Sequence, residues 1–242
     1  MSEHPLRGGS VSAVVRVGDT VRRPPSGRFV HDLLGFFERS GWDGAPRFLG
    51  VDERGREILS FVDGYVAWPP GTAGVTQEAS LARVAELVRE FHDLTAGTPL
   101  AGEREVVCHN DLAPNNTVYV RGAGLRPVAF IDWDLAAPGR RIDDVAHACW
   151  QYLGLGLGLG PGADAGRAAR GIRLICDAYR LDGRGEIVDV IMWWQDRCWR
   201  GIQAGAAAGD PAMVRLRADG AVRQVRAAFG WMAAHRSELE VS

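Results

Sequence analysis

The sequence contains no lysine, and all 28 of its basic residues are arginine. Any role that lysine usually fills must fall to arginine, whose planar guanidinium donates several hydrogen bonds at once, or stay unfilled. Excess charge is also missing, because 30 acidic residues leave a formal net charge of −2 and a pI near 6.3. This balance gives no general attraction to nucleic acids or to anionic membranes, so we expect neither as a partner.

Long hydrophobic runs are absent as well. The N-terminal stretch MSEHPLRGGS lacks the features of a signal peptide, and no window of about 18 apolar residues predicts a membrane span. We therefore expect a cytoplasmic protein. Cysteine is scarce and forms no CxxC pair, which argues against a disulfide scaffold or a zinc site. We expect the four cysteines to be small buried hydrophobic residues: Cys108, Cys149, Cys176 and Cys198.

The sequence contains enough apolar residues for a full hydrophobic core, 46% of 242. A chain of this length is expected to form one large domain or two small lobes. Near the N-terminus, two short strands are predicted at 13–17 and 20–23, joined by the turn dipeptide at 18–19. Apolar residues at helical spacing predict a helix over 30–40, and a strand pair should follow around the turn DERG at 52–55. The chain therefore begins as a small sheet with one helix.

The remainder of the chain reads as mainly helical. Residues 63–76, rich in glycine and proline at their start, are expected to form a hinge between a small lobe at 1–62 and a larger lobe at 77–242. The predicted fold class is α+β, a small sheet followed by helices. Apolar periodicity predicts five helices in the larger lobe: Glu78–Leu94, Asp143–Leu153, Asp164–Leu181, Glu186–Ala204 and Pro211–Glu240.

Two polar stretches interrupt short strand-like runs, CHNDLAPNNTVY at 108–119 and FIDWDLAAPG at 130–139. Each could be a surface turn. The sequence between them reads as a β-hairpin, however, so the loop before its first strand and the loop after its second strand should lie at the same end. That arrangement brings together three carboxylates and one amide: Asp111, Asn116, Asp132 and Asp134.

Carboxylates gathered in one place repel one another unless a cation holds them, and hard oxygen ligands suit Mg²⁺. In proteins Mg²⁺ often comes with phosphates, because it keeps several waters and takes few protein ligands. A carboxylate outside the metal shell can then accept a proton from an attacking hydroxyl group. These groups are the ones that phosphoryl transfer uses.

At these residues the sequence resembles a known family. His109 and Asp111, with Asn116 five positions on, match the HxDxxxxN catalytic loop of protein-kinase-like enzymes, and IDWD at 131–134 is similar to the IDW(D/E) motif of the aminoglycoside phosphotransferase family. The triplet DVA at 144–146 resembles the DLA element of that family. The resemblance covers most of the chain and is most specific in this catalytic core. It implies a bilobal protein-kinase-like fold with a nucleotide-binding N-terminal lobe.

The resemblance also implies residue roles. Asp111 would be the catalytic base and His109 an organiser of the loop, while Asn116 and Asp132 would bind Mg²⁺ and Asp134 would support the metal shell. Asp144 would brace the catalytic loop. Three residues would belong to the loop over the nucleotide phosphates: Gly8, Gly9 and Ser10.

The sequence departs from the family pattern in the small lobe. Kinase-like folds place a strand lysine on the nucleotide phosphates and hold it with a helix glutamate. Arg22 occupies the matching strand position, with Arg16 and Arg23 as alternatives, and the helix offers only His31 or Asp32 where the glutamate is expected. We expect Arg22 to contact the phosphates.

The function predicted from the sequence is O-phosphotransfer from ATP or GTP, with Mg²⁺, to a hydroxyl of a small molecule such as an antibiotic, a sugar or an amino alcohol. Between residue 163 and the C-terminus, 10 acidic residues and 12 arginines favour a neutral or weakly charged acceptor over a polycation. Two alternatives remain: a catalytically silent nucleotide- or protein-binding relative, and a Mg²⁺-dependent phosphate-ester hydrolase. The sequence makes no prediction of the oligomeric state.

Overall fold

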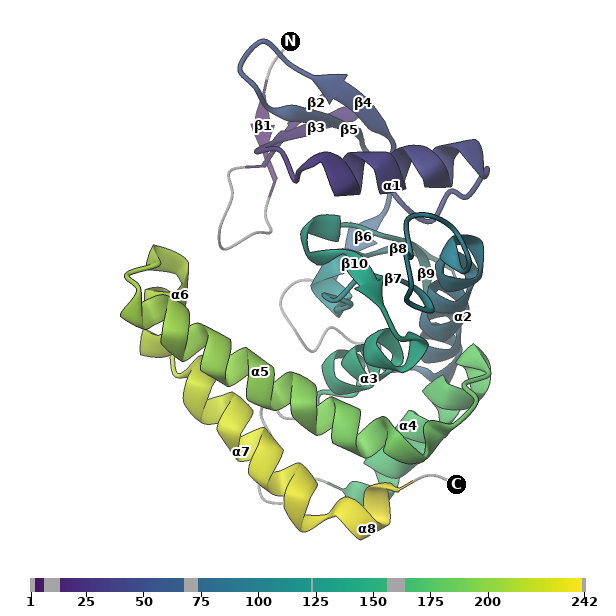
Figure 1. The fold of residues 1–242 in the computed structure, drawn as a ribbon, viewed down its shortest axis with the longest axis vertical. Helices are drawn as coiled ribbons and strands as arrows, with labels where there is room; N and C mark the ends of the chain where they lie inside the picture. The colour runs from purple at the N-terminus through teal and green to yellow at the C-terminus, as the bar shows by residue number, and fades with distance from the viewer. Residues whose placement is uncertain (1–2, 7–13, 68–73, 123, 156–163, 241–242) are drawn as a thin grey trace.

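The computed structural model describes residues 3–6, 14–67, 74–122, 124–155 and 164–240. Figure 1 shows an N-terminal sheet crossed by one helix, above a larger and mainly helical part. The predicted α+β organisation is therefore confirmed. None of the helices in these ranges is long and apolar enough to cross a membrane.

The N-terminal sheet contains five antiparallel strands in the order β1-β2-β3-β5-β4. Gly18 turns the chain between β2 and β3 with a φ of 61°, which a residue with a side chain adopts less readily. The pairing of β3 with β5 places Arg23 directly opposite Glu57. The strands are β1 (His4–Pro5), β2 (Val15–Val17), β3 (Thr20–Arg23), β4 (Phe48–Val51) and β5 (Glu57–Ser60).

Helix α1 (Arg28–Arg39) lies between this sheet and the rest of the molecule (Figure 1). The predicted helix is confirmed, although it begins two residues earlier than its apolar stripe. Its last residue is followed by Ser40 and by Gly41, whose φ of 69° ends the helix in the way typical of glycine. The buried face consists of Val30, Leu33, Leu34 and Phe37.

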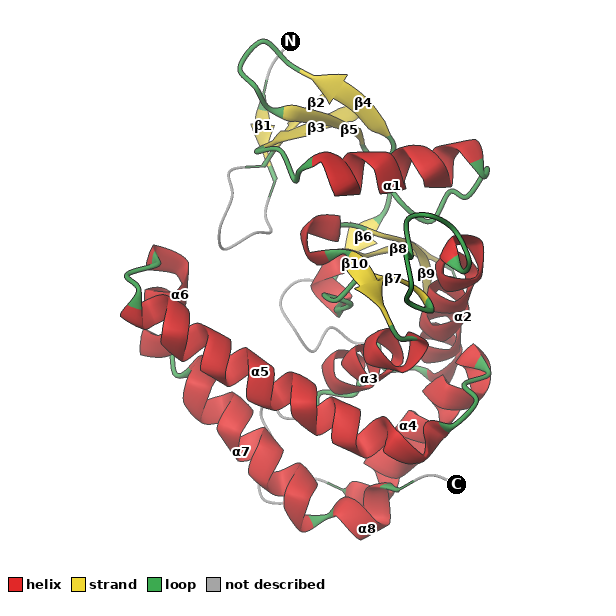
Figure 2. Ribbon diagram, in the orientation of Figure 1, coloured by secondary structure: helices red, strands yellow, loops and turns green. Residues whose placement is uncertain are grey.

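Two small sheets lie between α1 and the lower helices (Figure 2). The expected hairpin is present and antiparallel, with Thr117 paired to Phe130. The predicted linker also contains a strand, β6, which pairs with the first strand of the hairpin and so ties the connection to the lower part. These sheets contain β6 (Tyr65–Val66), β8 (Thr117–Arg121) and β9 (Leu125–Phe130) in one, and β7 (Val106–Cys108) and β10 (Ala137–Gly139) in the other.

The helical part agrees with the predicted pattern except at its C-terminal end. The single helix expected over 211–240 is in fact three helices. Gly220, with a φ of 86°, separates the first two, and His235 lies between the second and the third. The helices are α2 (Glu78–Thr95), α3 (Arg141–Tyr152), α4 (Ala165–Tyr179), α5 (Ile187–Ala207), α6 (Pro211–Ala218), α7 (Ala221–Ala234) and α8 (Arg236–Leu239), with 3-10 turns at Pro114–Asn116, Trp133–Leu135 and Arg184–Glu186.

An aromatic cluster joins the N-terminal part to the helical part. Phe37 of α1 lies 5.1 Å from Trp133 between ring centroids, and Phe91 of α2 lies at the same distance from Trp133 on another side. Trp133 is only 2% exposed, so it is a core residue and not a surface for ligand stacking. The Phe91 contact is edge-on and the Phe37 contact is tilted, and aromatic packing of this kind fixes side-chain orientation. It therefore supports the polar loop in which Trp133 lies.

Candidate active site

Two strand pairings bring the polar loops together. Cys108, just before the first loop, pairs with Ala137, just after the second, and Thr117, just after the first loop, pairs with Phe130, just before the second. Both ends of each loop are therefore fixed opposite the other loop. The side chain of Asn110 adds a direct link, because its Nδ2 donates a hydrogen bond of 2.9 Å to the carbonyl of Leu135.

Asp144 supports the first loop from beneath. This carboxylate is fully buried and accepts hydrogen bonds from the backbone N–H of His109 at 2.7 Å and of Asn110 at 2.9 Å. Burial alone would raise the pKa of Asp144, but His92 and His109 outweigh burial and lower it. The backbone of Asn110 is held with a φ of 63°, a left-handed conformation that costs free energy in a non-glycine residue. The expected brace is therefore present.

His92, Cys108 and Asp144 form a buried group whose potential ligand atoms lie within 4.8 Å of one another. Each already has hydrogen-bond partners. His92 contacts Asp144 through Nε2 at 3.1 Å and the Tyr179 hydroxyl through Nδ1 at 2.7 Å, and Cys108 Sγ donates to the Arg140 carbonyl at 3.2 Å. These contacts account for the group as part of the brace, so we do not interpret it as a metal site.

His109 has the contacts of a residue that orders the loop. Its ring is fully buried and lies 4.5 Å from the Trp133 ring, and its Nε2 is 3.1 Å from the carbonyl of Ile131. Its Nδ1 accepts a hydrogen bond of 3.3 Å from the backbone N–H of Asp111. Burial lowers the pKa of His109, so the ring is neutral and can donate from Nε2 while it accepts at Nδ1.

Asp111 and Asn116 are in direct contact. Asn116 Nδ2 donates to Asp111 Oδ2 at 2.7 Å and to the Asp111 carbonyl at 2.9 Å, so the amide sets the direction in which the carboxylate faces. Burial raises the pKa of Asp111 to about 7, and the negative charge of Asp132 adds to the rise, while the hydrogen bond from Asn116 opposes it. Burial and the neighbouring negative charge thus both favour the protonated form of the Asp111 carboxyl group.

The second loop carries Asp132 and Asp134. Asp132 follows β9 and adopts a φ of 65°, a second left-handed non-glycine residue in the site. Both carboxylates are about two-fifths exposed, and both contact the guanidinium of Arg23: Nη1 lies 2.8 Å from Asp132 Oδ1, and Nη2 bonds Asp134 Oδ2. Burial raises the pKa of Asp134, and the charge of Arg23 opposes that rise.

Arg22 and Arg23 are neighbours on β3 with different surroundings. Arg22 donates to Thr20 Oγ1 at 2.6 Å and lies 3.9 Å from an Asp52 oxygen, whereas Arg23 contacts the carboxylates of the polar loop. Side chains alternate along a strand, so the two guanidinium groups leave the sheet on opposite sides. Arg16, the third candidate, bonds the carbonyl of Gly18 on β2's turn.

Glu57 is a residue of this region that sequence reasoning missed. Its carboxylate is fully buried, and one oxygen lies 3.2 Å from Arg23 Nε. The sequence feature that could have drawn attention to Glu57 is its position at the start of the apolar strand EILS. In the structure this position lies opposite an arginine of β3. His31 of α1 contacts this glutamate at 2.8 Å. Gly8, Gly9 and Ser10, expected over the phosphates, lie outside the residues that the structure describes.

The donor set suits Mg²⁺. Asn116 Oδ1 and the carboxylates of Asp132 and Asp134 are hard oxygen ligands, and Arg23 leaves one oxygen of each carboxylate outside its own contact. Burial is the main cause of the raised pKa of Asp111, and the negative charge of Asp132 adds to it; a divalent cation bound here would relieve that repulsion. These residues therefore fit the metal that the sequence predicts.

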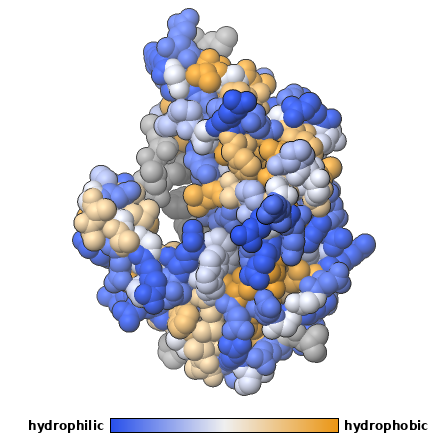
Figure 3. Space-filling model, viewed as in Figure 1, coloured by the Kyte–Doolittle hydropathy of each residue, from blue (hydrophilic) through white to orange (hydrophobic). Residues whose placement is uncertain are grey.

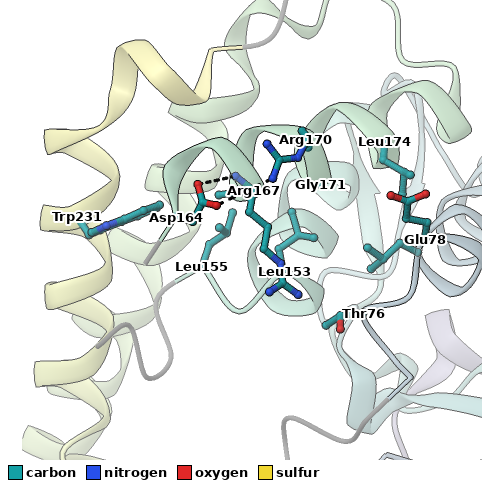
Figure 4. Close-up of a pocket in the computed structure, with 12 residues that line it drawn as sticks. Thr76, Glu78, Leu153, Leu155, Asp164, Arg167, Arg170, Gly171, Leu174 and Trp231 are labelled. Atoms are coloured by element: carbon teal, nitrogen blue, oxygen red, sulfur yellow. Dashed lines mark hydrogen bonds and ion pairs between the residues drawn. The ribbon is translucent and has the colours of Figure 1, made fainter. Parts of the chain in front are cut away.

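A cavity of about 450 Å³ lies elsewhere, along α4 (Figure 4). Its wall combines Leu153 and Leu155 with Arg167 and Arg170 of α4 and, from α7, Trp231. None of its lining residues belongs to either polar loop, so it is separate from the site described above.

Figure 3 shows that the molecular surface in this view is mostly hydrophilic, with smaller hydrophobic areas between the charged groups.

Comparison with known proteins shows the family to which the chain belongs. Residues 77–180 match the model of the "Phosphotransferase enzyme family". The chain is 31% identical to the trifolitoxin immunity protein of Rhizobium leguminosarum bv. trifolii, over 98% of this chain and 97% of that protein. This likeness covers much more of the chain than the residues that match the family model.

Solved structures share the fold at low sequence identity. A choline/ethanolamine kinase family protein from Mesorhizobium loti superposes with a TM-score of 0.66 at 16% identity, covering 99% of this chain and 92% of that one. An aminoglycoside phosphotransferase from Streptomyces rimosus, solved with ADP and streptomycin, gives a TM-score of 0.57 at 16% identity, covering 79% and 90%. The expected kinase-like fold is confirmed, and the chain belongs to the aminoglycoside phosphotransferase family of phosphotransferases.

Proposed function

We propose that this protein transfers the γ-phosphoryl group of ATP or GTP to a hydroxyl group of a small molecule. The acceptor oxygen forms a bond to the γ-phosphorus, the bond from that phosphorus to the β,γ-bridging oxygen breaks, and the acceptor's proton passes to a carboxylate. The products are a phosphate ester and a nucleoside diphosphate. The observation that carries the proposal is the Asp111–Asn116 contact, in a braced loop opposite Asp132 and Asp134.

In this mechanism Asp111 orients the acceptor hydroxyl and takes its proton. Asn116 holds the carboxylate in place through the 2.7 Å hydrogen bond, and the brace beneath the loop keeps both residues fixed as substrate binds. Asn116, Asp132 and Asp134 would hold Mg²⁺. When bound, the metal would neutralise charge on the phosphate oxygens. Positioning and electrostatics supply most of the catalysis in reactions of this class.

On the donor side, we propose Arg23 as the phosphate contact in place of Arg22. Arg23 is the strand arginine that reaches the carboxylates of the second loop. Its guanidinium can bind phosphate oxygens in a bidentate manner, as a lysine ammonium cannot. The aminoglycoside phosphotransferase from Streptomyces rimosus, which shares the fold, was solved with ADP, and this supports a nucleotide as the phosphoryl donor.

The acceptor we propose is a hydroxylated, neutral or weakly charged compound of the antibiotic-like class. One relative is named for immunity to trifolitoxin, and a phosphotransferase of the same fold was solved with streptomycin, so these two compounds are the first acceptors to test. On α5, Trp193 is 49% exposed and offers an aromatic surface, whereas Trp194 is buried and donates to the Asp143 carbonyl at 2.7 Å.

A second candidate, a catalytically silent relative that only binds nucleotide or protein, is favoured by one observation. Arg23 bonds both Asp132 and Asp134, the groups that nucleotide and metal would need. Turnover separates the two candidates. A screen with ATP and GTP against trifolitoxin, streptomycin, choline and simple sugars should give a phosphorylated product for the first candidate and binding without product for the second.

The mechanism is tested by comparing two isosteric variants. Asp111→Asn should keep nucleotide–Mg²⁺ affinity and lower kcat by about 10²-fold or more, the scale expected for loss of a positioned base. Asp132→Asn should weaken both nucleotide–Mg²⁺ binding and turnover, because it removes a metal ligand. Product formation by mass spectrometry and affinity by calorimetry give the two readings. Turnover of Asp111→Asn at the wild-type rate would contradict the proposed base.

A further inference from the structure

Glu57 is a fully buried carboxylate in the N-terminal sheet, a position that costs free energy unless the charge is compensated. Besides Arg23, three donors compensate this charge. The backbone N–H of Ser26 lies at 3.0 Å, the Ser26 hydroxyl at 2.7 Å, and His31 Nε2 at 2.8 Å. The loop before α1 and α1 itself thus fix where this charge sits.

Arg23 extends from this carboxylate toward the polar loops. Its Nε lies 3.2 Å from Glu57 as an ion pair, although the N–H is not aligned as a hydrogen bond, and its two terminal nitrogens bond Asp132 and Asp134. One guanidinium therefore meets three carboxylates. The arginine side chain is 11% exposed, so little water takes part.

The three carboxylates differ in how easily they can be released. Asp132 and Asp134 are 41% and 40% exposed, and water can solvate them if Arg23 leaves, whereas Glu57 is 0% exposed and would be stranded without a counter-ion. A phosphate group that reaches Arg23 would therefore displace the two aspartates and leave the ion pair with Glu57 intact. The strand pairing favours the same outcome, because β3 and β5 are hydrogen-bonded neighbours that keep Arg23 directly opposite Glu57.

We infer that Glu57 is the positioning residue for Arg23, and that Arg23 exchanges Asp132 and Asp134 for the phosphates of a bound nucleoside di- or triphosphate. The inference rests on the proposed function and adds a residue from outside α1. Helix α1 contributes His31, which contacts Glu57. Among the contacts described, no acidic residue of α1 contacts Arg23. The carboxylate paired with the strand cation therefore lies in the sheet, on β5, and not on α1.

Calorimetric titration with ADP and with GDP, each with Mg²⁺, tests the inference. Glu57→Gln should weaken binding by at least about tenfold, the loss typical of a charge-assisted contact. Asp52→Asn is the matched control, because it removes a carboxylate beside Arg22 in the same sheet. Its affinity should stay within about twofold of the wild type, as expected for a site away from the ligand.

A double-mutant cycle distinguishes positioning from a purely structural role. If Glu57 acts through Arg23, the double variant Arg23→Ala with Glu57→Gln should bind nucleotide no more weakly than Arg23→Ala alone. Additive losses, or a Glu57→Gln protein that unfolds at lower temperature yet binds like the wild type, would overturn the inference. If Glu57→Gln does not fold, Ser26→Ala replaces it and should weaken binding to a smaller extent; unchanged affinity there also overturns the inference.

The outcomes separate this inference from the proposed function. Nucleotide binding by the wild type together with an unaffected Glu57→Gln variant refutes the role of Glu57 and leaves the proposed function standing. A wild type that binds neither nucleotide refutes both.

Discussion

The loop that carries Asp111 is held by hydrogen bonds to Asp144 and Ile131, whereas Arg23, across the site, combines hydrogen-bonded ion pairs to the second loop with an unaligned ion pair to Glu57. Asp144 accepts two backbone N–H groups of the loop, and His109 links that loop to Ile131. Arg23 instead lies between Glu57 of its own sheet and the aspartates of the second loop.

This difference explains why one side keeps the family pattern and the other does not. A hydrogen bond requires a donor and an acceptor at a set distance and angle, so the loop depends on particular residues at particular spacings. A charge acts over a longer range and with less directional demand. The counter-charge of a strand cation can therefore come from β5, and the cation can be an arginine, while the ion pair is retained.

The largest effect on stability is expected when the Asp144 carboxylate, which accepts the hydrogen bonds of the loop, is replaced. Asp144→Asn removes a buried charge and puts an amide donor near the N–H groups of His109 and Asn110, so the free energy of unfolding should fall by about 3–5 kcal/mol. Urea unfolding measures the loss. Asp143→Asn, at the exposed start of α3, is the control and should cost about 1 kcal/mol. Equal losses in the two variants would contradict the brace.

A smaller effect is expected in the pH dependence of stability, and it comes from His147, which contacts the same loop. His147 contacts the carbonyl of Leu112 at 3.1 Å, and burial lowers its pKa to about 4, with Asp144 opposing the shift and His109 adding to it. As the pH falls from about 6.5, the unfolded chain takes up a proton before the folded chain does. Stability present above pH 6.5 should thus be lost as the pH approaches 4, by about 2–3 kcal/mol for this residue.

His147→Asn tests that expectation, because the amide can still donate to Leu112 but does not titrate. Urea midpoints at pH 7.5, 6 and 5 should fall less steeply for the variant than for the wild type. Some slope should persist, since burial also lowers the pKa of His92 and of His109. Parallel slopes in the two proteins would show that His147 is not a source of the acid sensitivity.

The smallest effect is expected from Arg22→Ala, and it sharpens the comparison of the two strand arginines. Arg22 contacts Thr20 and lies near Asp52, so its removal should change the free energy of unfolding and of nucleotide binding by about 0.5 kcal/mol or less. Arg23→Ala should weaken binding by at least about tenfold. Calorimetry with ADP and Mg²⁺ measures both. A larger loss for Arg22→Ala would return the phosphate contact to Arg22, as the sequence suggests.

Local patterns predicted much of the fold. Apolar spacing located α1 and α2 to within two residues at their ends, because each helix buries one continuous face. The same reasoning treated 211–240 as one helix, since a stripe of apolar residues continues past Gly220 and periodicity does not register a left-handed turn. Strand β6, two residues long, is too short to give a pattern.

The sequence by itself determined that the two polar loops meet. Asp111, Asn116, Asp132 and Asp134 lie at the ends of one hairpin, and hairpin geometry brings such ends together whatever surrounds them. Only the tertiary structure decided how the opposite side is built. Arg23 and Asp132 are separated by 109 positions, and their contact depends on how the sheet packs on α1 and on which side of β3 each arginine faces. The contact of Glu57 with Arg23 is evident only once β5 is seen to pair with β3. An ion pair between two strands requires no particular spacing of the residues along the chain, so the sequence does not indicate it.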